Sequence, residues 1–129
     1  MNEAVNELVV SIARKFLEYA SVAASGWDEA FLRFEVNKEA TGLTSIYRAG
    51  DQSAYFDYDD ELEFEFYSDV EKDFTKLQSL ILKEAGKEFC VCLVRVDSKY
   101  NYKLYYEYED QQKWFITKMG GESGIPVLD

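Results

Sequence analysis

One segment of the chain has residue types and a spacing that could do chemistry: the run DYDDELEFEFYSDVE from Asp57 to Glu71. It contains eight acidic side chains and no basic one, and aromatic or aliphatic residues separate them. Carboxylates gathered in this way can bind calcium, act as an acid–base pair on a sugar, or attract a positively charged partner. They can also be simply the solvated face of an amphipathic strand, which is the usual reading of a charge run.

The first two chemistries have little support in the sequence. The oxygen ligands of Asp57, Asp59, Asp60 and Glu61 suit calcium, but the run lacks the glycine and the twelve-residue spacing of an EF-hand loop. The two carboxyl groups of an acid–base pair must face each other across a cleft. Among 25 acidic residues some will be close in sequence by chance, so their proximity does not indicate such a pair. Histidine is absent, which removes the usual general base and the commonest transition-metal ligand. No phosphate loop, nucleophile elbow or zinc spacing is present, so we expect no enzyme, no metal and no cofactor.

The overall charge favours the third chemistry, attraction of a basic partner. Fourteen Lys and Arg stand against 25 Asp and Glu, which gives a net charge of −11. Such a field repels phosphate backbones and anionic membranes and speeds encounter with basic proteins. We therefore expect no binding to nucleic acid. The sequence has neither a long apolar run nor a basic flank at Met1, so we also expect no membrane contact and a cytoplasmic location.

The elements that must position the acidic run can be predicted from the spacing of apolar residues. Steps of three and four residues predict a helix from Asn2 to about Ala24. Alternation then predicts a strand at 27–36, with Arg33 and Glu35 on its polar face. Shorter strands are predicted at 43–48 and 54–57, joined by a turn at 49–53.

The acidic run is predicted to be extended at its centre. Alternation would place Leu62, Phe64 and Phe66 toward the core and leave Glu61, Glu63 and Glu65 in water. Ser68 stands three residues before Glu71, the spacing of a capping box, so a second helix is predicted to begin near Asp69. This helix is predicted to end at Gly86.

The last third of the chain is predicted to form a hairpin and a short helix. The segment 88–96 is apolar at successive positions, which predicts a strand covered on both faces at the centre of the sheet. It includes Cys90 and Cys92, which we interpret as small buried side chains in a reducing compartment. A strand at 102–108 would pair with it, and Asp110 would cap a short helix containing Trp114, Phe115 and Ile116.

This order of elements predicts an α+β fold in a single domain spanning 1–119, followed by a flexible tail at 120–129. The sheet would be mostly antiparallel, with four to five strands and two main helices packed on one face. Five tyrosines between Tyr100 and Tyr108 add rigid aromatic area of the kind found at interface anchors and in half-buried strands.

Three segments carry a resemblance to a known family: GWDEAFLRFEV opening the first strand, FTKLQSLILKEAG in the second helix, and the final hairpin closing on YYEYED. In the order of its elements the chain resembles the YezG-like family of bacterial immunity proteins over most of Met1 to Asp110. The resemblance implies a small cytoplasmic antitoxin, without enzymatic activity, that binds a co-encoded polymorphic or contact-dependent toxin, commonly a nuclease.

We therefore expect the chain to neutralise a basic toxin domain through acidic and aromatic side chains. The oligomeric state and the identity of the toxin stay open. A general acidic adaptor, or a DNA mimic that blocks nucleic-acid-binding proteins, is the alternative. The residues expected to bind the partner are Asp57, Tyr58, Asp59, Asp60, Glu61, Glu63, Glu65, Tyr105, Glu107, Glu109 and Asp110.

Overall fold

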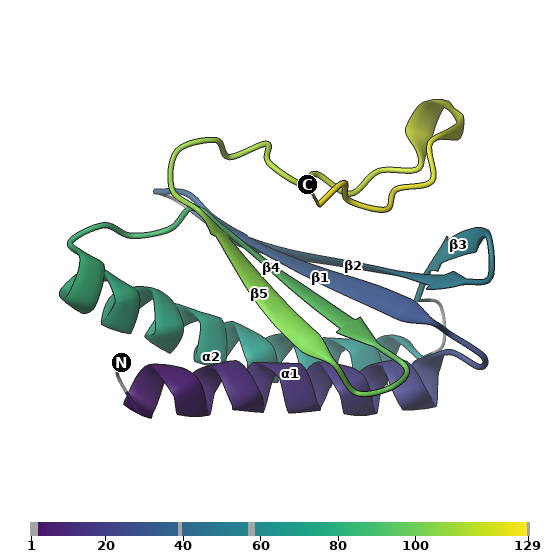
Figure 1. Ribbon diagram of the computed structural model, residues 1–129, viewed down its shortest axis with the longest axis horizontal. Helices are drawn as coiled ribbons and strands as arrows, with labels where there is room; N and C mark the ends of the chain where they lie inside the picture. Colours follow the sequence, from purple (N-terminus) through teal and green to yellow (C-terminus); the bar gives the residue numbers. More distant parts are fainter. Residues whose placement is uncertain (1–2, 39, 57–58, 129) are drawn as a thin grey trace.

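The computed structural model describes residues 3–38, 40–56 and 59–128. Two long helices lie side by side on one face of a five-stranded sheet, and the C-terminal segment crosses the other face (Figure 1). This arrangement confirms the predicted α+β class and the two helices on one face. The elements are α1 (Glu3–Ala23), β1 (Glu29–Val36), β2 (Thr41–Ala49), β3 (Gln52–Tyr55), α2 (Asp60–Ala85), β4 (Val91–Asp97), β5 (Tyr102–Glu107) and the 3₁₀ helix η1 (Met119–Gly121).

The strand order of the sheet is β3-β2-β1-β4-β5, and every neighbouring pair is antiparallel. The central strand is therefore β1, and the prediction that placed the segment 88–96 at the centre was wrong. The strand β4 is apolar on both faces because each face is covered. Cys92 and Val94 belong to the core under the helices, whereas Leu93 packs beneath the C-terminal segment.

The main core lies between the helices and the sheet, and aromatic rings fill most of it. Phe34 of β1 stacks on Phe74 of α2, with 4.6 Å between ring centroids. Tyr19 of α1 stacks on Phe66 of α2 at 4.3 Å. Such rings bury large apolar areas and gain further from their stacked geometry. These contacts hold the N-terminal and central turns of α2 against both α1 and the sheet.

The helix α2 begins nine residues earlier than the capping box predicted, at Asp60 instead of Asp69. The prediction of an extended acidic strand was therefore wrong. Its N-cap is Asp59, whose Oδ1 accepts a hydrogen bond from the backbone N–H of Leu62 at 3.0 Å. Ser68 lies inside the helix and caps nothing. The predicted end is confirmed, because Gly86 has a left-handed φ of 74° and its N–H bonds to the carbonyl of Leu82.

The predicted polar face of β1 is covered rather than exposed, because the chain returns across it after β5. Arg33 is only 2% exposed there. Its guanidinium donates to the carbonyl oxygens of Lys113 at 2.9 Å and Gln111 at 2.6 Å, and to Glu35 Oε1 at 2.7 Å. It also lies 5.7 Å from the ring centroid of Phe115. The central strand thus holds the C-terminal segment through one buried cation.

The short helix predicted at Trp114 is a turn instead. Asp110 accepts the backbone N–H of Gln112 and caps that turn, while the 3₁₀ helix η1 comes later. Part of the predicted tail lies against the sheet. A Cβ added to Gly124 would lie 2.6 Å from Ile46 Cδ1, and Ile125 and Leu128 pack against the same cluster. The mobility of this tail stays a prediction. Among the described residues, neither helix is both apolar and long enough to span a bilayer.

Candidate functional site

The first two turns of α2 present four exposed side chains on one face: Asp60, Glu61, Phe64 and Glu65. Helical spacing groups positions i, i+1, i+4 and i+5, so these four point together away from the core. We call this set the acidic face of α2. Phe64 lies among the three carboxylates and is 72% exposed. In the part of the chain that the structure describes, none of the three carboxylates has an ion pair with Lys or Arg.

The neighbouring acidic residues have structural tasks that set them apart from this face. Glu63 turns toward α1, where its Oε2 accepts a hydrogen bond from the Tyr19 hydroxyl at 3.4 Å. Burial raises the pKa of Tyr67 to about 12, an effect that the negative charge of Glu63 increases. Asp69 forms an ion pair with Lys15 at 3.0 Å. These acids join the two helices, and only the outward ones are available to a partner.

Asp59 caps the helix that carries the acidic face, so its replacement should show how the site is positioned. The change Asp59→Ala removes the acceptor of the Leu62 N–H, and we expect the free energy of unfolding to fall by about 1 kcal/mol. Asp59→Asn keeps a side-chain acceptor and should restore most of the loss. Urea denaturation of the three proteins measures the effect. Equal stability of Asp59→Ala and the parent chain would show that the cap contributes nothing.

A shallow groove of about 280 Å³ runs beside the acidic face between α1 and α2. Its walls combine apolar and charged side chains: Val22, Glu18 and Lys15 come from α1, and Leu62, Glu65 and Asp69 come from α2. Glu65 therefore belongs to both the acidic face and the groove. Asp69 is already paired with Lys15, so a partner side chain with an apolar stem and a basic end would meet Leu62 and Glu65.

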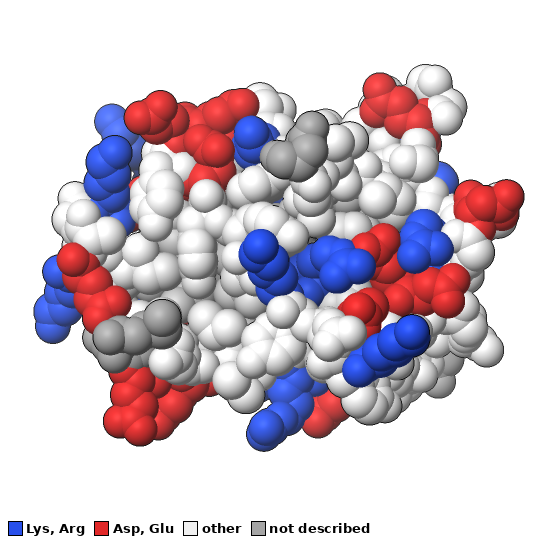
Figure 2. Space-filling model, in the orientation of Figure 1, with Lys and Arg blue, Asp and Glu red and all other residues white. Residues whose placement is uncertain are grey.

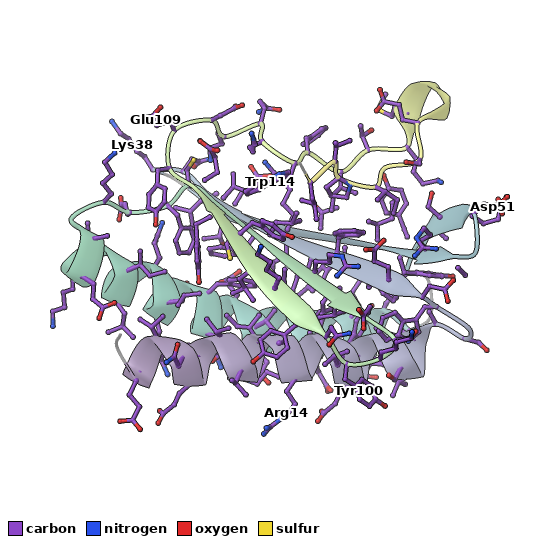
Figure 3. The ribbon with its side chains drawn as sticks, viewed as in Figure 1. Arg14, Lys38, Asp51, Tyr100, Glu109 and Trp114 are labelled. Carbon is purple, nitrogen blue, oxygen red and sulfur yellow. The ribbon has the colours of Figure 1, made fainter. Side chains whose placement is uncertain are left out.

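The other predicted site residues lie at the opposite end of α2. The carbonyl of Glu107 accepts the N–H of Cys90, just beyond the C-terminus of that helix. Figure 3 shows Glu109 at this end of the molecule, near Lys38. A helix of 26 residues is about 39 Å long, so one partner side chain cannot contact both groups. Tyr105 faces the C-terminal segment, where its ring contacts Trp114.

Two acidic side chains at this second end, Glu107 and Asp110, accept hydrogen bonds in the turn after β5. Glu107 Oε2 accepts the backbone N–H groups of Asp110 and Glu109, each at 3.1 Å. These hydrogen bonds lower the pKa of Glu107. We therefore separate Tyr105, Glu107, Glu109 and Asp110 from the candidate site. Asp57 and Tyr58 lie outside the described residues.

A second charged group, on the uncovered end of the sheet, is internally neutralised. Figure 2 shows basic and acidic side chains next to one another over this end. Glu29 of β1 accepts from Arg48 at 3.2 Å on one side and from Arg95 on the other. This pairing leaves little net field for a partner, in contrast to the acidic face of α2.

We compared the chain with known proteins. Neither the protein-family models nor the curated proteins gave a match. The resemblance to the YezG-like family stays a prediction.

The exposed carboxylates of the acidic face can attract a positively charged partner. Within residues 3–38, 40–56 and 59–128, no three His, Cys, Asp or Glu side chains are grouped to hold a metal ion. Phe64 is the residue that sequence reasoning missed, because strand alternation assigned it to the core. The signal that could have found it is the four-residue step from Leu62 through Phe66 to Val70, which continues the stripe of α2 and excludes Phe64.

Proposed function

We propose that this chain is a non-catalytic cytoplasmic immunity protein that binds a basic toxin domain, commonly a nuclease, through the acidic face of α2. The observation that carries the proposal is Phe64, an aromatic ring that is 72% exposed among three carboxylates. None of these carboxylates has an ion pair with a described residue. Acidic residues at a helix N-terminus are explained by the helix dipole alone. The helix dipole does not explain an exposed phenyl ring, because an uncharged apolar group is stabilised neither by the dipole nor by contact with water. A partner that covers the ring accounts for both features.

In this proposal the two kinds of side chain act at different stages of binding. Asp60, Glu61 and Glu65 attract the positive surface with which a nuclease meets phosphate, and they accelerate the encounter. Phe64 then enters an apolar pocket of the toxin and slows dissociation, as buried aromatic anchors do. The toxin is inactivated because the immunity protein occupies its substrate path.

The experiment is to measure binding of the chain and its Phe64→Ala variant to the toxin domain encoded by the adjacent gene. We expect the variant to bind at least about 30-fold more weakly, mainly through faster dissociation, because an aromatic hot spot contributes about 2 kcal/mol or more. Met119→Ala is the matched control, since Met119 is 81% exposed on the segment that covers the opposite face of the sheet. Biolayer interferometry gives both rate constants.

Two results would contradict the proposal. Unchanged dissociation of Phe64→Ala would remove Phe64 from the interface. Binding of the parent chain to many unrelated basic proteins with similar affinity would instead favour the acidic adaptor or DNA mimic, which needs charge but no apolar anchor.

A further inference from the structure

The strand β5 is an edge of the sheet, and no other strand of the described residues pairs with its outer side. The sheet order ends at β5, whose pairing residues all face β4. In Figure 1 this edge faces the viewer, and neither the helices nor the C-terminal segment covers it. Among the described residues, no backbone hydrogen bond from another segment reaches the outer side of β5. A six-residue edge rich in tyrosine is a template for another strand.

The register of the β4–β5 pair shows which backbone groups are available. Asp97 N–H bonds to the carbonyl of Asn101, so 97 and 101 form a hydrogen-bonded pair. The same kind of pair recurs every two residues along the ladder, and residues 103, 105 and 107 therefore direct their backbone groups toward β4. The N–H and C=O groups of Tyr102, Leu104 and Tyr106 point outward and are free to pair.

The surface beside this edge is apolar and hollowed. A groove of about 660 Å³ lies between α1 and the β4–β5 hairpin, and its walls include Val10, Leu17 and Tyr102. Tyr102 is 43% exposed and Tyr100, at the hairpin tip, is 69% exposed. An added strand would cover part of this groove with every second side chain. Hydrogen bonds and apolar burial would then act together at one surface.

We propose that the occupant of this edge is a second copy of the chain, with the two β5 strands antiparallel about a two-fold axis at Tyr105. In this register Tyr105 faces its own copy, and Leu104 faces Tyr106 of the other chain as a hydrogen-bonded pair. Lys103 of each chain stands opposite Glu107 of the other. The sheet becomes continuous across the dimer, with the helices of both chains on the same face.

Charge complementarity selects a second copy over a basic partner. The strand β5 contains one lysine and one glutamate, so its local charge is zero although the chain carries −11. The register about Tyr105 pairs both charges with their opposites, and opposite charges across strands stabilise a sheet. The rim of the groove also carries one charge of each sign, Arg14 and Glu18. The surface is distinct from the acidic face of α2, so the dimer does not depend on the proposed function.

The first test is the mass of the purified chain in solution, measured by light scattering after size exclusion. At micromolar concentration we expect twice the chain mass of 15.0 kDa. Lys103→Glu places two acidic residues opposite each other at both ends of the pair and should raise the dimer dissociation constant about tenfold or more. Lys72→Glu, the same charge change at an exposed position on α2 away from this edge, should leave the dimer unchanged. A monomeric parent chain at 100-fold higher concentration would overturn the proposal.

The second test uses disulfide cross-linking to determine which residues face each other in the dimer. Its result does not depend on the dimer dissociation constant. Tyr105→Cys should form a cross-linked dimer under mild oxidation, because each Tyr105 faces its own copy in a close non-hydrogen-bonded pair. Lys103→Cys should not, since Lys103 faces Glu107. Both changes are made in a Cys90→Ser background so that the half-buried Cys90 thiol cannot interfere, and circular dichroism checks folding. Cross-linking of Lys103→Cys in place of Tyr105→Cys would overturn the register.

Discussion

Replacing Arg33 with alanine should lower the free energy of unfolding by about 3–5 kcal/mol, the effect of breaking a buried charged network. The guanidinium donates to two backbone carbonyls and to Glu35, and it is 2% exposed. Its removal leaves the carbonyls of Gln111 and Lys113 without their donor and creates a cavity under the C-terminal segment. A lysine cannot replace the planar fork that reaches these acceptors, so Arg33→Lys should recover little of the loss.

Urea denaturation measures this loss, and limited proteolysis locates it. We expect cleavage within 109–128 to become faster in Arg33→Ala, because that segment loses its main attachment to β1. Arg48→Ala is the matched control, since Arg48 is a partly exposed arginine on the same face and should cost about 1 kcal/mol or less. Equal losses for the two alanine variants would show that Arg33 acts as an ordinary surface arginine.

Reversing the three charges of the acidic face should slow association with the toxin domain about 100-fold at low salt. The variant Asp60→Lys, Glu61→Lys and Glu65→Lys replaces an attractive local field with a repulsive one, and steering changes association rates by about 10- to 1,000-fold. The difference should shrink as salt rises, because screening removes the field that both proteins feel. Stopped-flow mixing at several ionic strengths measures the association rate constants.

A control with the same net charge separates the local field from the total charge. Glu84→Lys, Glu88→Lys and Glu122→Lys change the charge by the same amount at exposed positions away from the acidic face. We expect this variant to lose much less of the association rate. Similar losses for both triple variants would show that net charge alone drives the encounter and that the acidic face is not the docking surface.

The sequence by itself determined those features that depend on the local spacing of apolar residues and on the overall composition. The stripe of apolar residues at three- and four-residue steps correctly predicted α1, and the pattern at 88–108 correctly predicted the β4–β5 hairpin. The structure turns the face that carries Leu104 and Tyr106 toward the helices. The helix and the hairpin are local features, because the period of the apolar residues already fixes which residues share a face. The excess of acidic residues likewise needs no fold to be known.

The secondary structure of the acidic run could not be decided from the local sequence. The letters LEFEF satisfy both a two-residue and a four-residue period, so Phe64 and Phe66 were equally acceptable as core residues of a strand. Packing separates them: Phe66 stacks on Tyr19 and Phe16, whereas Phe64 has no such ring contact among the described residues. Contacts between residues more than forty positions apart made the run helical, and no window of the sequence contains them.

Tertiary structure also decided what lies on the second face of the sheet. An arginine that alternates with apolar residues is typical of a solvent-facing position, and Arg33 is buried only because the chain returns over it some eighty residues later. The same long-range assembly places Glu107, Glu109 and Asp110 far from the N-terminus of α2. The sequence therefore established an acidic, aromatic-rich α+β protein. Only the tertiary structure showed which carboxylates form the candidate site, namely the three that surround the exposed ring of Phe64.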